Sequence, residues 1–168
     1  MKLERLVTSL EISKKLNKIG FLEKSIFSYY KNQNGDVFVG ETDLTNEKNE
    51  FLNYCYTFSE LLNFLPDELE ITPDTYVPND KTYEKVTLEN YEFDKYHFAQ
   101  LDFFKSKIGN GIDNFVMRYS YKGKMIAFRQ NSEGQYCNIL QYGNTEVECC
   151  AYMIMLLIQE DKFNYKLV

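Results

Sequence analysis

The sequence predicts an α+β fold: an antiparallel sheet of about four to six strands, with an N-terminal and a C-terminal helix packed on it. Two segments, 9–19 and 146–160, carry apolar residues at helical spacing and begin at residues that cap helices. Two pairs of strand-like segments are joined by turn sequences, Asn34-Gly35 and Lys122-Gly123. At 168 residues, the whole chain 1–168 is expected to form one domain.

The C-terminal helix is the element around which we expect the core to form. Thr145 can cap its first turn, and Glu148 stands three residues later, as in a capping box. Ile154 lies at the centre of its apolar stripe. The apolar run 151–158 is shorter than the roughly 20 residues that cross a bilayer, so the pattern indicates a buried helix.

The same Thr-x-x-Glu pattern marks two further helix starts. Thr8 with Glu11 predicts a helix over 9–19, which Gly20 can end. Thr57 with Glu60 predicts a short helix over 58–64, because Pro66 disfavours helix at the residue before it.

The first hairpin joins 25–31 to 36–40 and is apolar on both faces. A loop of two or four residues places Tyr30 with Val37 and Val39, and Tyr29 with Phe38. We therefore expect this hairpin to be covered on both sides, or to use its second side as a contact surface. A further short strand is predicted at 51–56.

The second hairpin, 115–129, pairs Ser120 with Met125 through a two-residue turn. Further strands are predicted at 82–88 and 136–140. The segment 94–108 is predicted to be a helix that ends near Gly109.

An irregular, acidic excursion is expected at about 66–113. Ten acidic and three basic residues lie within 66–102, while the whole chain has a formal charge of −6. This negative net charge argues against direct binding of nucleic acid. The excursion is either a solvated loop or an acidic contact surface that mimics phosphate. The candidate contact residues in it are Asp67, Glu68, Glu70 and Asp74.

Few residues offer chemistry. His97, the single histidine, could act as an acid or base with Asp94 or Asp102, although no nucleophile motif accompanies it. Glu68 and Glu70 would share a strand face and could bind a metal. Since both patterns are common on solvated surfaces, the sequence assigns no catalytic residue, metal or cofactor.

Basic side chains gather on the second hairpin with Tyr119 and Tyr121, where a nucleobase could stack, although a solvated hairpin tip is the simpler interpretation. The basic residues are Arg118, Lys122, Lys124 and Arg129.

The cysteines and the N-terminal segment bear on location. Cys55, Cys137, Cys149 and Cys150 have no Cys-x-x-Cys spacing, which favours buried free thiols in a reducing compartment. The first residues lack an apolar signal core, and no stretch is typical of a transmembrane span. We expect a cytoplasmic protein that does not associate with membranes.

Tyr152 and Leu156 lie on the back of the C-terminal helix, opposite Ile154. Either a second layer, for instance from 94–108, covers them, or they form an exposed contact patch. A contact patch would most simply make a homodimer.

Three segments together resemble a family of small phage and prophage proteins of bacteria. The segments are TSLEISKKLNKIGF with IFSYYK, then YTFSELLNFLP, then TEVECCAYMIMLLIQED. The resemblance lies in helix caps and core residues, and no catalytic motif is part of it. Two departures are Tyr29-Tyr30 in place of the family's tryptophan and a longer 66–113 region. The resemblance implies a phage or prophage origin and action in the bacterial cytoplasm.

The first functional hypothesis is a non-enzymatic binding protein that acts on a host or defence component, with an unidentified protein as its partner. The alternatives are a small hydrolase or nucleotide-binding enzyme that uses His97 and nearby carboxylates, and a virion structural or assembly component.

Overall fold

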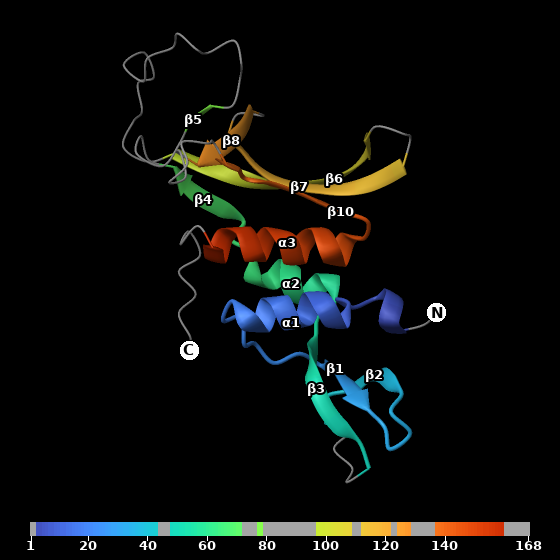
Figure 1. Cartoon of the computed structure of the whole chain (residues 1–168). Coiled ribbons are helices and arrows are strands. Elements are labelled where there is room, and N and C mark those ends of the chain that lie inside the picture. The colour runs from blue at the N-terminus through green and yellow to red at the C-terminus, as the bar shows by residue number, and fades with distance from the viewer. Residues whose placement is uncertain are drawn as a thin grey trace. The chain divides into compact units, whose positions relative to one another are not determined.

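The computed structural model describes residues 3–43, 48–71, 77–78, 97–108, 112–121, 124–128 and 137–159. The chain divides into two compact units. The first unit joins Met1–Leu65 to Gly143–Val168, and the second unit is Pro66–Tyr142. The predicted α+β class is confirmed, with helices near both ends and two antiparallel sheets where one was expected (Figure 1). A single domain over 1–168 stays a prediction.

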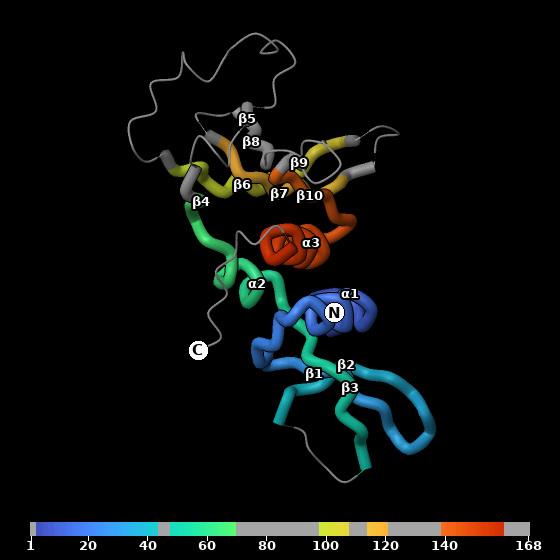
Figure 2. Tube along the Cα trace, turned by 60° about the vertical axis from the view of Figure 1, so that its left-hand side comes forward, coloured from blue at the N-terminus to red at the C-terminus, as the bar shows by residue number. Residues whose placement is uncertain are grey.

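The first unit contains the helices and the smaller sheet. Its described elements are the 3-10 helix η1 (Leu3–Arg5), α1 (Leu10–Lys18), β1 (Phe27–Lys31), β2 (Val37–Glu41), β3 (Glu50–Cys55), α2 (Phe58–Phe64) and α3 (Glu146–Gln159). The three strands are antiparallel in the order β2-β1-β3. Helix α3 contacts both α1 and α2, and α1 contacts β3 (Figure 2).

Helix α1 begins one residue later than its capping box predicts. The hydroxyl oxygen of Ser9 accepts the N–H of Ile12, so Ser9 is the N-cap. Thr8 instead lies buried, where its hydroxyl accepts the N–H of Tyr56 and bonds the hydroxyl of Ser13. The predicted cap at Thr8 is wrong because that hydroxyl serves a tertiary contact between α1 and the end of β3.

Helix α2 confirms its prediction. The hydroxyl oxygen of Thr57 accepts the N–H of Glu60, and the Glu60 carboxylate accepts the N–H of Thr57. The helix covers 58–64, as expected, and ends before Pro66.

Helix α3 confirms the predicted core helix, since Thr145 accepts the N–H of Glu148 and Ile154 is fully buried. The Glu148 carboxylate accepts the N–H of Asn144 rather than that of Thr145. Cys55, Cys149 and Cys150 are buried free thiols, as predicted. Among the described residues, no helix is both long and apolar enough to cross a membrane.

The first hairpin has a different register from the prediction. Tyr30 pairs with Phe38 and Tyr29 pairs with Val39, because the loop between β1 and β2 covers residues 32–36. The carbonyl oxygen of the Asn32 side chain accepts the N–H groups of Asn34 and Asp36, which stabilises this longer loop over a two-residue turn.

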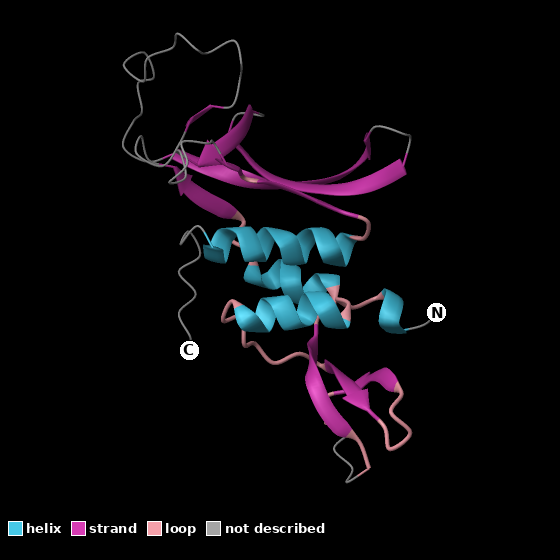
Figure 3. Ribbon diagram, in the orientation of Figure 1, coloured by secondary structure: helices cyan, strands magenta, loops and turns pink. Residues whose placement is uncertain are grey.

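The second unit holds the larger sheet, shown as strands in Figure 3. Its described strands are β4 (Glu68–Ile71), β5 (Val77–Pro78), β6 (His97–Ile108), β7 (Ile112–Tyr121), β8 (Lys124–Phe128), β9 (Cys137–Asn138) and β10 (Leu140–Gly143), whose last residue belongs to the first unit. The order is β4-β6-β7-β8-β5, with β10 paired to β7 and β9 paired to β8. Ser120 pairs with Met125, as predicted.

The predicted helix over 94–108 is wrong, because β6 occupies 97–108 as a long strand. The strand pairs with β4 on one side and with β7 on the other, so two neighbours satisfy its backbone groups. The strand predicted at 136–140 is divided between β9 and β10. The strand predicted at 82–88 lies outside the described residues.

Candidate functional site

Four aromatic side chains form one face of the small sheet, which we call the outer aromatic face: Tyr30, Phe38, Phe51 and Tyr54. Tyr30 stacks on Phe38 with 5.8 Å between ring centroids and meets Phe51 edge to face at 6.2 Å. Phe51 in turn meets Tyr54 edge to face at 5.2 Å. All three strands contribute, so the four rings form one continuous row across the sheet.

A bulge places Phe51 on this face. The register between β1 and β3 shifts between Tyr29 and Tyr30, so that Asn53 pairs with Tyr29 while Phe51 pairs with Tyr30. Without the extra residue, the alternation of a strand would put Phe51 and Asn53 on the same face. With it, Phe51 joins Tyr30, and the Asn53 side chain accepts a hydrogen bond from Asn17 of α1 at 3.0 Å.

Tyr30 is the most buried member of the row, with 1% of its surface exposed. Its hydroxyl lies 2.6 Å from the carbonyl oxygen of Thr42 and 3.1 Å from that of Glu41, and donates its hydrogen between them. Burial raises the pKa of the Tyr30 hydroxyl, which therefore stays protonated as a donor. This anchor fixes the ring against which Phe38 and Phe51 pack.

Phe51 is the most accessible member of the row, with 46% of its surface exposed, while Phe38 and Tyr54 are half-buried. A large aromatic ring held in place by neighbouring rings loses little conformational freedom when it is covered. Such rings are the usual anchors of protein interfaces.

The opposite face of the small sheet is the one that packs into the hydrophobic core. Tyr29, Val39 and Cys55 form a buried cluster with Val7 of the N-terminal segment, and Leu10 of α1 packs against it. The Tyr29 hydroxyl donates to the carbonyl oxygen of Thr8 at 3.0 Å. The sheet is therefore covered on one side by the N-terminal segment and α1, and it presents the aromatic row on the other.

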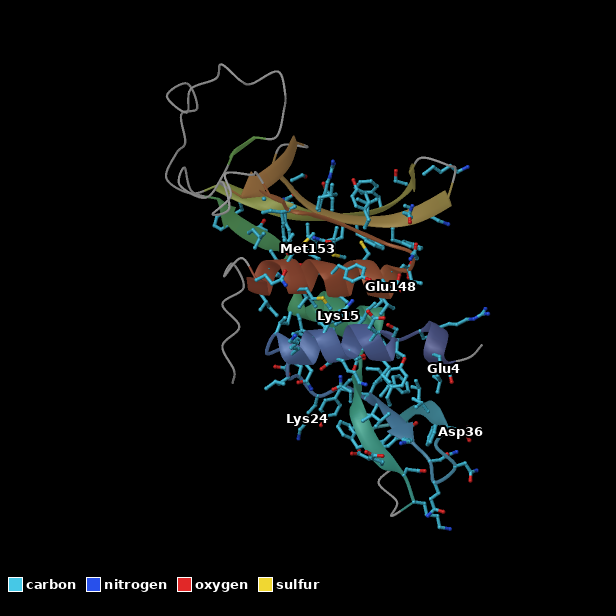
Figure 4. The ribbon with its side chains drawn as sticks, viewed as in Figure 1. Glu4, Lys15, Lys24, Asp36, Glu148 and Met153 are labelled. Carbon is cyan, nitrogen blue, oxygen red and sulfur yellow. The ribbon has the colours of Figure 1, made fainter. Side chains whose placement is uncertain are left out.

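Charged residues of both signs line two hollows in the loops of the small sheet. A hollow of about 280 Å³ where β2 ends is lined by Ile26, Phe27, Glu41, Thr42 and Asp43. Another, of about 300 Å³, lies at the loops near the start of β3 and is lined by Lys31, Asn32, Gln33, Lys48, Asn49 and Glu50. A further acidic residue, Asp36, lies in the loop between β1 and β2 (Figure 4). An aromatic centre with a mixed polar rim is the usual composition of a protein-binding surface.

The acidic residues singled out in the sequence belong to the second unit. Asp67 and Glu68 are exposed, and Glu68 pairs with Gln100 of β6. Glu70 pairs with Phe98, so both glutamates lie on strand β4, in a segment that was expected to be irregular. Asp74 lies outside the described residues. An acidic contact surface on 66–102 stays a prediction.

Tyr152 and Leu156 belong to α3 in the first unit. Leu156 has 8% of its surface exposed, and Tyr152 is half-buried. The second layer suggested for 94–108 does not form as a helix, since that segment contains β6. A homodimer contact through Tyr152 and Leu156 stays a prediction, with Tyr152 its more accessible member.

The candidate catalytic residues do not come together in the described structure. His97 is the first residue of β6 and pairs with Ile71. The Asp102 carboxylate instead accepts hydrogen bonds from Arg118 and Ser120, and Asp94 lies outside the described residues. Within the described part of the chain, no group of three or more His, Cys, Asp or Glu residues could hold a metal ion.

Sequence reasoning found part of the outer aromatic face. The apolar second side of the first hairpin indicated a possible contact surface, but Phe51 and Tyr54 were predicted only as strand residues. The bulge that turns Phe51 outward depends on pairing with β1, so no local pattern marks it.

Comparison with known proteins adds no relative. No family model matches the chain, and neither a curated protein nor a solved structure matches it.

Proposed function

We propose that this chain is a phage- or prophage-encoded binding protein that recognises a protein of the bacterial host through its outer aromatic face. The observation that carries the proposal is the exposed ring of Phe51, held between Tyr30 and Tyr54 on the side of the sheet opposite the core cluster. The phage origin and the cytoplasmic site of action rest on the sequence resemblance.

Protein recognition is favoured by the composition of this face. The face itself consists of four aromatic residues, and acidic and basic residues together line two hollows in the loops of the same sheet. A nucleic-acid surface would instead gather positive charge along the phosphate path. A protein partner can place apolar side chains on Phe51 and pair its own polar groups with the charged residues of the nearby loops.

The proposal is tested by affinity capture from a lysate of the bacterial host with three purified proteins: wild type, Phe51→Ser and Leu22→Ser. Leu22 is the matched control, because it is a large apolar residue in the same unit with 53% of its surface exposed and lies outside the aromatic row. All three proteins should first be shown to have cooperative unfolding.

The proposal expects a discrete host protein that wild type and Leu22→Ser retain and that Phe51→Ser loses. Equal capture by all three proteins, or capture of none, would contradict it. The enzyme hypothesis and the virion hypothesis stay predictions. Turnover of nucleotides or phosphate esters would support the first, and incorporation into purified particles would support the second.

A further inference from the structure

Arg118 in the second unit is held in one orientation by neighbours on two strands. It lies on β7 directly across from Asp102 of β6, and its Nε is 3.1 Å from the Oδ2 of that aspartate. The hydroxyl of Ser120 donates to the same oxygen at 2.6 Å. The carboxylate is thereby fixed from two sides, and it fixes one edge of the guanidinium.

One face of the guanidinium is covered as well. Its central carbon lies 5.2 Å from the ring centroid of Phe104, which is a cation–π distance. Phe104 is an exposed residue on β6, two positions beyond Asp102 and on the same face of the sheet. The Arg118 side chain retains 28% of its surface exposed.

The restraints leave the outer end of the guanidinium available. Nε is the nitrogen that bonds Asp102, and the two terminal Nη groups have no hydrogen-bond partner within the described part of the chain. These two groups lie side by side in a plane and match the two oxygens of a carboxylate or a phosphate. An arginine that is already oriented loses little entropy when it binds such a group.

The residues around Arg118 favour a carboxylate over a phosphate. Asp102 contributes a negative charge beside Arg118, and Glu68 is exposed across from Gln100 on the same sheet. A dianionic phosphate would meet this repulsion more strongly than a carboxylate with a single charge. The exposed ring of Phe104 offers apolar contact to whatever carries the anion.

We infer that Arg118, with Phe104, forms a binding site for a single carboxylate carried next to an apolar or aromatic group, such as the chain end or an acidic side chain of a bound peptide. The two Nη groups bind the carboxylate oxygens, and Phe104 contacts the neighbouring apolar group. The inference does not rest on the proposed function, because its residues lie in the second unit.

The test is an NMR titration of the intact chain that follows the side-chain nitrogen signals of Arg118 and, so that binding by Arg118→Lys can be measured as well, the backbone amide signals of β6 and β7. The probes are N-acetylphenylalanine, its neutral amide N-acetylphenylalaninamide, and phenyl phosphate. The proteins are wild type, Arg118→Lys, Phe104→Leu and, as a control that removes a positive charge from the same sheet, Lys107→Ala, whose side chain is exposed.

The inference expects a saturable shift of the Arg118 signal with N-acetylphenylalanine and none with the amide. Arg118→Lys keeps the charge but loses the paired donors, and should weaken binding about tenfold. Phe104→Leu should weaken it less, and Lys107→Ala should leave it unchanged. The absence of a saturable shift in wild type, equal binding of the amide, or tighter binding of phenyl phosphate would each overturn the inference.

Discussion

The carboxylate of Glu60, at the start of α2, accepts a hydrogen bond from the backbone N–H of Ile26 at 3.0 Å. The same oxygen lies 2.8 Å from the hydroxyl of Ser25, while the other oxygen completes the capping box with Thr57. One side chain therefore caps a helix and also holds the segment that leads into β1.

This arrangement predicts acid sensitivity. Burial opposes ionisation of Glu60, but the hydrogen bonds from the Thr57 and Ile26 N–H groups and from the Thr57 and Ser25 hydroxyls outweigh it. The pKa of Glu60 therefore lies below its ordinary value of 4.5. Because the folded pKa is the lower one, the stabilisation is complete above pH 4.5 and is lost as the pH falls through the folded pKa.

Urea unfolding at a series of pH values measures this effect. Glu60→Gln should lower the free energy of unfolding at neutral pH and flatten its fall in acid. Glu11→Gln is the matched control. The hydrogen bond and charge of Lys15 lower the pKa of Glu11 as well, but this pair lies on an exposed surface. A wild-type acid profile in Glu60→Gln would show that the network does not couple to folding.

Gly143 should not tolerate alanine, for reasons of space. A Cβ at this position would overlap the backbone N and Cα of Cys149, in the first turn of α3. Backbone atoms cannot move as a side chain can, so Gly143→Ala should cost about 1–3 kcal/mol of folding free energy. Thermal unfolding tests this.

Gly20→Asn is the control for that substitution. Gly20 has a φ of +91° with nothing within 4 Å of an added Cβ, and asparagine adopts this left-handed backbone more readily than other residues. Gly20→Asn should lower the unfolding temperature less than Gly143→Ala does. The reverse order would contradict the close approach of Gly143 to the backbone of Cys149.

Thr8→Val should be strongly destabilising although it conserves shape. The buried hydroxyl of Thr8 accepts the Tyr56 N–H at 3.0 Å, and valine would leave that N–H without this partner. Leaving one buried donor unsatisfied costs about 1–3 kcal/mol. Thr8→Ser retains the hydroxyl and should lose less, as measured by the urea midpoint. Equal losses of stability in Thr8→Val and Thr8→Ser would show that packing, and not the hydrogen bond, causes the destabilisation.

Local signals predicted the three α-helices of the first unit well. Thr57 and Glu60 define the start of α2 within four residues of sequence, and Pro66 limits its end, so α2 matches its predicted bounds. The shift of the first cap from Thr8 to Ser9 could not be predicted, because the competing partner of Thr8 is Tyr56, which is distant in the sequence.

The segment 97–108 shows where local reasoning fails. Its apolar residues fit a helical stripe, but alternation also separates Phe98 and Phe104 from Ala99 and Leu101 on the two faces of a strand. Pairing with β4 and β7 decides between the two patterns. Strand β4 is distant in the sequence and β7 begins at Ile112, so both partners lie outside the segment. The candidate site depends on the same kind of information, since the bulge that exposes Phe51 arises from pairing with β1.

The central claim is that the outer aromatic face binds a protein, and site-specific photocrosslinking in host cells tests it most directly. A photoreactive phenylalanine analogue at position 51 should form a covalent adduct with one discrete protein, and the same analogue at position 22 should not. No adduct from position 51, or the same adducts from both positions, would contradict the claim.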